Sequence, residues 1–173
     1  MKSSEAIDLI KVGLSHNTEA EVWADLGAGS GTFTRALASL LKAGSIIYAM
    51  DRSASTLDPT VYANASIVHV KIDFVDEEIT VHQLDGVLMA NALHFVADKM
   101  SFVKKLKKSL KPSGRLILVE YNFDTPSHWV PHPISYKTLT RRRDDWGLQS
   151  VTMIGQRPSI YNQASMYSAV IEF

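Results

Sequence analysis

The stretch Glu21-Val22-Trp23-Ala24-Asp25-Leu26-Gly27-Ala28-Gly29-Ser30-Gly31-Thr32-Phe33 decides the fold of this chain. An apolar run ends in an acid, three glycines follow at every second position, and a helical pattern begins directly after them. Glycine tolerates a positive φ and has no Cβ, so this spacing suits a backbone that turns sharply while a ligand lies against it. The pattern predicts a strand, a glycine-rich turn and a helix N-terminus, which is the opening unit of a nucleotide-type α/β site.

The composition of the 173 residues is that of an ordinary globular domain. Hydrophobic residues make up 46% and charged residues 21%, which disfavours a disordered or fibrous class. Eighteen Lys and Arg balance 18 Asp and Glu, so the chain lacks the basic excess expected of a nucleic-acid binder. Because the chain has no cysteine, disulfides, thiolate metal sites and cysteine nucleophiles are excluded.

The N-terminal residues Met1 to Glu5 are too polar for a signal peptide. No apolar run reaches the roughly 20 residues that a membrane-spanning helix needs. We therefore expect a cytoplasmic protein with no membrane partner.

Outside the glycine turn, strand-like and helix-like patterns alternate along the chain. The apolar runs predict strands at about 21–26, 46–50, 67–72, 84–90, 115–120, 149–154 and 167–172. Helical spacing predicts helices at about 5–17, 33–43, 95–110 and 134–146, a short helix or loop at 53–65, and a turn at 112–114. Alternation of this kind is typical of a Rossmann-like, doubly wound α/β sheet of about seven mostly parallel strands. The last two strands are too close in sequence for a helical crossover, so we expect them to pair antiparallel.

Four consecutive predicted strands end in a small polar residue: Asp25, Asp51, Asp73 and Asn91. A single Asp at a strand end is more often a turn or helix cap than a ligand group. Four in series are different, because ligands of open α/β sheets bind beyond the carboxyl ends of the strands, near the point where the strand order reverses. Together the four residues predict an acidic, hydrogen-bonding rim at that edge of the sheet.

The rim favours a cationic ligand without phosphate. A dinucleotide site uses the pattern G-x-G-x-x-G, but here Thr32 stands where its third glycine would fall, and Asp25 flanks the turn. A pyrophosphate on a helix N-terminus tolerates no excess of nearby acid. A P-loop is excluded, because the chain contains no G-x-x-x-x-G-K-[ST] pattern.

These motifs resemble those of the class I S-adenosylmethionine-dependent methyltransferases, over about residues 20–121. Asp25 to Gly31 is similar to the first motif of that family, and Asp51 lies twenty residues after Gly31, where the family places an acid that holds both ribose hydroxyls. The resemblance implies S-adenosylmethionine as cofactor, S-adenosylhomocysteine as product, and cofactor contacts from Asp25, Gly27, Ala28, Gly29, Asp51, Arg52, Asp73, Phe74, Asn91 and Ala92. The residues from Lys111 to Leu116 resemble the family's turn into the fifth strand.

A single domain over residues 1–173 follows from this reading. It comprises an N-terminal helix or lid (1–19), a cofactor-binding core (20–121), and an acceptor-side loop, helix and terminal β-hairpin (122–173). We expect this domain to be an enzyme that moves a methyl group by in-line displacement to O, N or C of a small-molecule acceptor. A homodimer, in which the second subunit completes the acceptor pocket, is an alternative to a monomer.

Methyl transfer mainly requires that the nucleophile be held close and aligned, and a base is needed only if the acceptor must lose a proton. His94 is the candidate catalytic base, although a His that caps or packs the next helix is an open alternative. The candidate residues lining the acceptor pocket are His94, Tyr121, His128, Trp129 and Tyr136. No metal is expected, because Pro131 and Pro133 disfavour a helix that would align His128 with His132.

Three other functions remain as alternatives. The first is a non-catalytic S-adenosylmethionine-binding partner subunit. The second is an RNA or protein methyltransferase, for which Lys104–Lys111 and Arg141–Arg143 would be the basic surfaces, although the Asn/Asp-Pro-Pro-aromatic pattern of base methylation is missing. The third is a nicotinamide oxidoreductase, which Thr32 and the acidic rim disfavour.

Overall fold

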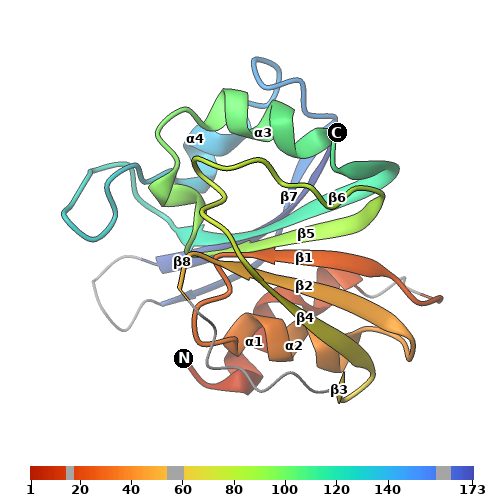
Figure 1. Cartoon of the computed structure of the whole chain (residues 1–173). Helices are drawn as coiled ribbons and strands as arrows, with labels where there is room; N and C mark the ends of the chain where they lie inside the picture. Colours follow the sequence, from red (N-terminus) through yellow and green to blue (C-terminus); the bar gives the residue numbers. More distant parts are fainter. Residues whose placement is uncertain (15–17, 54–60, 159–164) are drawn as a thin grey trace.

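An eight-stranded sheet runs through the computed structural model, which describes residues 1–14, 18–53, 61–158 and 165–173 (Figure 1). Its strands, in sheet order, are β3 (Val61–Tyr62), β4 (Ala65–Lys71), β2 (Ser45–Asp51), β1 (Val22–Leu26), β5 (Leu84–Ala90), β6 (Leu110–Tyr121), β8 (Ser165–Glu172) and β7 (Ser150–Pro158). The five strands from β4 to β6 are parallel, whereas β8 is antiparallel to both β6 and β7. This order confirms the predicted doubly wound sheet with antiparallel strands at its end, and the two-residue β3 adds a short edge to the seven expected strands.

The strand order reverses at β1, which pairs with β2 on one side and β5 on the other. Gly86 lets these central strands pack closely, because a Cβ at that position would lie 2.3 Å from the Trp23 indole. Trp23 is fully buried, and its ring nitrogen donates to Glu21 at 2.8 Å. The glycine turn after β1 therefore starts from a rigid base at the switch point.

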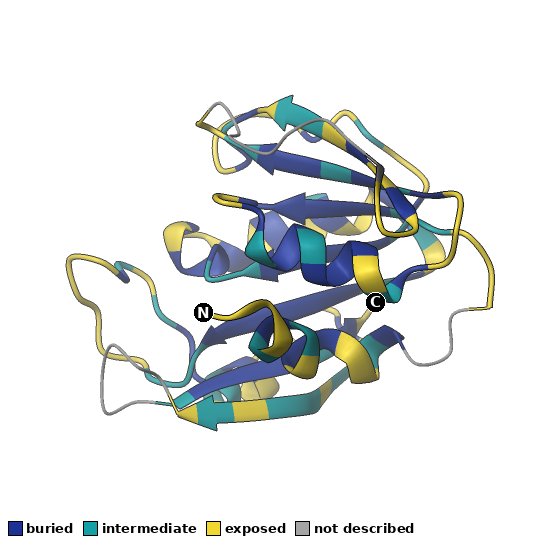
Figure 2. Ribbon diagram, turned by 90° about the horizontal axis from the view of Figure 1, so that it is seen from below, coloured by how far each residue is buried: buried dark blue, intermediate teal, exposed yellow. Residues whose placement is uncertain are grey.

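Two layers of helices cover the sheet, one on each face (Figure 1). Helices α1 (Ser3–Ile10) and α2 (Thr32–Leu40) bury Leu9 and Leu37 against one face. Helices α3 (Lys99–Lys107) and α4 (Tyr136–Arg141) bury Phe102 and Leu139 against the other. Figure 2 shows the same division by burial, with largely buried central strands and helices whose outer faces are exposed.

Several element boundaries differ from those predicted. Helix α3 begins at Lys99, later than the expected residue 95, because the Asp98 side chain accepts from the Ser101 amide at 3.0 Å and caps it. The residues before that cap, Leu93–Phe95, form the short 3₁₀ turn η2. The first helix ends at Ile10 and continues as the 3₁₀ turn η1 (Lys11–Leu14), while α4 ends at Arg141.

Two predicted features need a different description. The expected turn at 112–114 lies inside the bounds of β6, where the pairing with β5 shifts: Leu84 faces Leu110, but Gly86 faces Arg115. Residues 54–60, which make up most of the expected short helix or loop at 53–65, lie outside the described residues, as does the predicted end of the first helix at 15–17.

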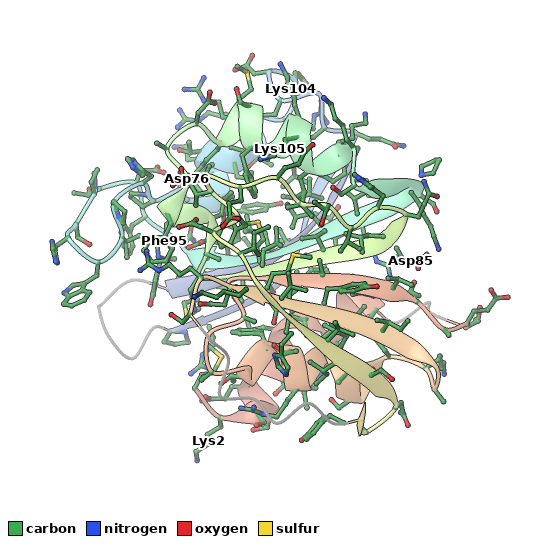
Figure 3. All side chains as sticks on the ribbon, viewed as in Figure 1. Lys2, Asp76, Asp85, Phe95, Lys104 and Lys105 are labelled. Atoms are coloured by element: carbon green, nitrogen blue, oxygen red, sulfur yellow. The ribbon has the colours of Figure 1, made fainter. Side chains whose placement is uncertain are left out.

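The carboxyl ends of the parallel strands meet at one edge of the sheet, and this edge carries the candidate site. Figure 3 places Phe95 and Asp76 at that edge and Asp85, at the start of β5, at the opposite one. Among the described residues, no helix is long and apolar enough to cross a membrane.

Candidate functional site

The glycine turn after β1 has a backbone conformation that favours glycine. Gly27, Gly29 and Gly31 have φ values of 80°, 51° and 76°. The amides of Gly27 and Ala28 both donate to the Met50 carbonyl, at 2.8 and 3.1 Å, which ties the turn to β2. A Cβ at Gly27 would lie 2.8 Å from the Ala92 Cβ, so only glycine leaves space between the turn and the end of β5.

The Asp51 carboxylate joins the end of β2 to the glycine turn. Its Oδ2 accepts from the Gly29 amide at 2.9 Å, and its Oδ1 accepts from the Ser53 amide at 2.9 Å. Each carboxylate oxygen has two lone pairs, so both retain capacity for a further donor. The side chain is thus fixed in orientation and able to accept from two neighbouring hydroxyls.

Asp51 lies in a cavity of about 490 Å³, which we call the acidic cavity. Its walls also include Asp73, Asp76, the ring of Phe74 and the partly exposed Phe95. Asp73 is oriented by a hydrogen bond from the Val75 amide to its Oδ1 at 3.1 Å. The volume is in the range of cavities that hold cofactors, and the wall combines aromatic faces with carboxylates.

Asn91 ends β5 in an unusual conformation. Its φ is 53°, a left-handed value that is uncommon for a residue with a side chain, and its amide donates to the Val119 carbonyl at 2.8 Å. Its side-chain Oδ1 is buried and makes no hydrogen bond within the described residues. A strained residue with an unpaired buried acceptor, beside a cavity, is typical of a ligand-binding position.

A second cavity, of about 250 Å³, adjoins the same turn and shares Gly27, Gly29 and Asn91 with the acidic cavity. We call it the Arg157 cavity, after the cation in its wall. Asp25 also lines it and is almost completely buried, with the Thr34 hydroxyl donating to its Oδ2 at 2.6 Å. Burial raises the pKa of Asp25 to about 7, an effect that the Thr34 hydrogen bond opposes and the charge of Asp51 reinforces.

This raised pKa predicts a pH-dependent stability. Between about pH 4 and pH 7 the folded chain holds a proton on Asp25 that the unfolded chain releases, so the stabilisation present at low pH is lost as the pH rises. The slope from this group reaches at most about 1.4 kcal/mol per pH unit. In thermal unfolding without ligand, Asp25→Asn should therefore lose less stability than the parent chain as the pH is raised from 5 to 8. Asp145→Asn, an exposed control, should follow the parent, and identical curves for Asp25→Asn and the parent would refute the assignment.

His94 forms a buried pair with Glu120. The His94 Nδ1 lies 2.9 Å from Glu120 Oε2 and 3.2 Å from Oε1, and the His94 amide donates to Oε1 at 3.1 Å. Both side chains are at most 4% exposed. His94 Nε2 makes no hydrogen bond within the described residues, and the rings of Phe95 and Tyr121 lie 4.3 and 6.0 Å from the imidazole, centroid to centroid. Phe95 borders the acidic cavity and Tyr121 borders the Arg157 cavity, whereas His94 and Glu120 themselves line neither.

The structure brings together all of the predicted cofactor residues. All ten line one or both cavities: Asp25, Gly27, Ala28, Gly29, Asp51, Arg52, Asp73, Phe74, Asn91 and Ala92. Tyr121, a candidate for the acceptor pocket, lines the Arg157 cavity.

Three predicted acceptor residues lie elsewhere. The Tyr136 hydroxyl donates to the Val151 carbonyl at 3.3 Å and accepts from the Met153 amide at 3.2 Å, so this side chain anchors α4 to β7 and lines neither cavity. His128 and Trp129 lie on the irregular segment after β6 and are in contact with each other, and Trp129 is 81% exposed. None of these three residues lines the acidic cavity or the Arg157 cavity.

Two candidate functional residues, Glu120 and Arg157, were not predicted from the sequence. Glu120 ends the apolar run of β6 next to Tyr121, so the same strand-end signal that marked Asp25 and Asp51 would have found it. Arg157 carries no local signal, because only the pairing of β7 with β8 brings it to the site. Within the described ranges, no group of three His, Asp or Glu side chains could hold a metal ion.

Comparisons with known proteins identify the family of this chain. A family model described as a methyltransferase domain matches residues 24–116, more than half of the chain. The chain is 26% identical, over 83% of its length, to the reducing polyketide synthase ppsB of Aspergillus oryzae, but it spans only 7% of that protein.

Solved structures share the fold at low identity. A SAM-dependent methyltransferase from Aquifex aeolicus superimposes with a TM-score of 0.62 at 15% identity, with all of both chains covered. The 1,6-didemethyltoxoflavin-N1-methyltransferase of Burkholderia thailandensis, solved with its acceptor and S-adenosylhomocysteine, gives a TM-score of 0.65 at 15% identity, covering 99% of this chain and 78% of the other. The chain therefore belongs to the methyltransferase domain family, and it is a member of the class I S-adenosylmethionine-dependent methyltransferases.

Proposed function

We propose that this methyltransferase acts on a small-molecule acceptor that must lose a proton, and that the His94–Glu120 pair takes that proton. The observation that carries the proposal is the buried hydrogen bond of 2.9 Å between His94 Nδ1 and Glu120 Oε2. Methyl transfer to an acceptor that is already nucleophilic needs no base, so a buried His–carboxylate pair at this position favours an acceptor with a weakly acidic proton.

The residues of the two cavities fit S-adenosylmethionine, which supplies an electrophilic methyl group on a sulfonium when bound. We assign the two ribose hydroxyls to Asp51, whose oxygens are oriented and retain acceptor capacity. Asp73 suits the adenine amino group and Phe74 the face of the ring. The unpaired Oδ1 of Asn91 and the space beside Gly27 suit the amino-acid end.

The hydrogen bonds of the pair determine which nitrogen of His94 is the base. An ionised carboxylate only accepts, so Glu120 places the imidazole proton on Nδ1 and leaves the lone pair on Nε2. A second hydrogen bond, from the His94 amide to Oε1, holds the carboxylate to the same turn. Glu120 thus acts as a positioning residue that orients the ring and stabilises the imidazolium after proton transfer.

The flanking rings restrict water around the base. The rings of Phe95 and Tyr121 both lie near the imidazole, and each residue also borders a cavity. An acceptor held against these two rings would lie close to His94 and next to the amino-acid end of the cofactor. Exclusion of water strengthens the hydrogen bonds of the pair.

Among proton-bearing acceptors, we propose a carbon acid, meaning a carbon next to a carbonyl group. The similarity to a reducing polyketide synthase supports this class, because polyketide chains carry carbonyl groups that make the adjoining C–H acidic. Such a proton is less acidic than that of many O–H acceptors, so a dedicated base has more to contribute. Transfer to O or N is the alternative outcome of the test.

A panel of three acceptors tests the proposal. The purified chain is incubated with methyl-labelled S-adenosylmethionine and a β-ketoacyl thioester, a catechol or an aromatic amine, and products are analysed by mass spectrometry. We expect label on the α-carbon of the thioester, retained after hydrolysis. Transfer to the catechol or amine alone would overturn the carbon assignment. Tight S-adenosylhomocysteine binding with no transfer to any acceptor would favour the non-catalytic partner subunit.

A further inference from the structure

Arg157 carries a buried nitrogen that has no hydrogen-bond partner in the part of the chain that the structure describes. Its side chain is 19% exposed, and its Nη2 donates to Glu5 Oε1 at 2.9 Å. Its Nη1 is buried and makes no hydrogen bond within the described residues. An unpaired buried donor on a charged group is costly, so its presence beside a cavity suggests that a ligand completes it.

The fold holds the guanidinium in place from two sides. Arg157 lies near the end of β7, opposite Met166 of β8, which lines the same cavity. Glu5, in the first turn of α1, engages one nitrogen and is itself fixed by a hydrogen bond from the Lys2 amide to its Oε2 at 2.7 Å. A guanidinium is a planar fork of five donors, so this contact fixes its orientation, and within the described residues Nη1 remains available to a second carboxylate.

The wall of the Arg157 cavity carries both signs of charge. Arg157 is its cation and Asp25 its buried acid, and the glycine turn lies in the same wall. A ligand end with one cationic and one anionic group, such as an α-amino acid, matches this pair. The cavity adjoins the acidic cavity, because Gly27, Gly29 and Asn91 line both, and this adjacency suits a single ligand with one end in each.

We propose that Arg157 binds the carboxylate at the amino-acid end of S-adenosylmethionine, with Asp25 near the ammonium group. This inference rests on the proposed assignment of the nucleoside to the acidic cavity. It gives β7 and α1 a role in cofactor binding, because β7 carries Arg157 and α1 carries Glu5, which orients it.

Two ligands separate the halves of the cofactor. S-adenosylhomocysteine contains the amino acid, whereas 5′-methylthioadenosine has the same nucleoside and sulfur without it. In calorimetric titration, Arg157→Gln should lower the affinity for S-adenosylhomocysteine roughly 10- to 100-fold, the range for a charged hydrogen bond. The affinity for 5′-methylthioadenosine should stay unchanged. Arg157→Lys, which keeps the charge but loses the fork, should fall between the parent and Arg157→Gln.

Two further variants exclude indirect effects. Arg142→Gln removes an exposed arginine that pairs with Asp145 away from the cavities, and it should leave both affinities unchanged. Glu5→Gln breaks the same ion pair but keeps the Arg157 charge, so it should weaken S-adenosylhomocysteine less than Arg157→Gln does. Thermal unfolding of each variant checks that it is folded.

The outcomes distinguish this inference from the function on which it rests. If the parent chain binds neither ligand, the proposed cofactor site fails and the inference fails with it. If the parent binds both and Arg157→Gln binds S-adenosylhomocysteine equally well, only the Arg157 assignment is overturned. An equal loss of affinity for both ligands in Arg157→Gln would also overturn it. So would a loss of S-adenosylhomocysteine affinity in Glu5→Gln as large as that in Arg157→Gln, because the effect would then come from the attachment of α1.

Discussion

Asp51→Ala should reduce the affinity for S-adenosylhomocysteine by at least about 100-fold while the chain remains folded. The substitution removes both carboxylate oxygens that we assign to the ribose hydroxyls, and charged hydrogen bonds contribute about 1.5–3 kcal/mol each. It also removes the hydrogen bond of 2.9 Å that the Gly29 amide donates to Asp51 Oδ2, so the glycine turn loses its connection to this side chain. Calorimetric titration measures the affinity, and thermal unfolding measures the stability.

A conservative variant and a remote one make the result interpretable. Asp51→Asn keeps one acceptor oxygen and should retain part of the affinity. Asp8→Ala removes an exposed carboxylate of α1 that pairs with Lys11, and it should bind like the parent. Undiminished affinity in Asp51→Ala would refute the ribose assignment.

Replacement of the proposed base should lower turnover by about 10²- to 10⁴-fold with little change in cofactor affinity. His94→Gln removes the proton acceptor. Glu120→Gln keeps the shape of the partner, but its amide can donate to Nδ1 and so favours the tautomer in which Nε2 is protonated. Both variants should reduce kcat for a carbon-acid acceptor, whereas S-adenosylhomocysteine should bind as it does to the parent.

The alternative is that this buried pair only supports the ends of β5 and β6. In that case both variants would lower the melting temperature, and the folded fraction would retain its kcat. His82→Gln, at an exposed position, provides a matched control for both measurements. A raised KM with unchanged kcat would likewise contradict a role in proton transfer.

Local sequence signals were sufficient for much of the fold. The glycine turn was predictable because positive φ values at Gly27, Gly29 and Gly31 depend on the residues themselves. The parallel sheet followed from alternating periods, since strand and helix patterns are read over a few residues. The start of α3 was missed because the Asp98 cap competes with an apolar spacing that continues N-terminal to it.

The parts of the site that sequence could not supply depend on long-range pairing. The contact between His94 and Glu120 joins residues 26 apart in the chain, and the one between Glu5 and Arg157 joins residues 152 apart. No local pattern encodes such distances. The hydrogen bonds of the Tyr136 hydroxyl with Val151 and Met153 were not predictable for the same reason, since they depend on the position of β7.

One backbone contact ties the segment after β6 to the proposed base. The His132 amide donates to the His94 carbonyl at 3.0 Å, and Pro131 and Pro133 on either side have no amide hydrogen. His132 is therefore the one donor in this tripeptide, and the register of the contact cannot slip by a residue. The loop before it, which carries the exposed Trp129, can then vary in length and sequence during evolution or engineering without moving the imidazole. The backbone around the proposed base should therefore tolerate changes in this loop as long as position 132 is not proline.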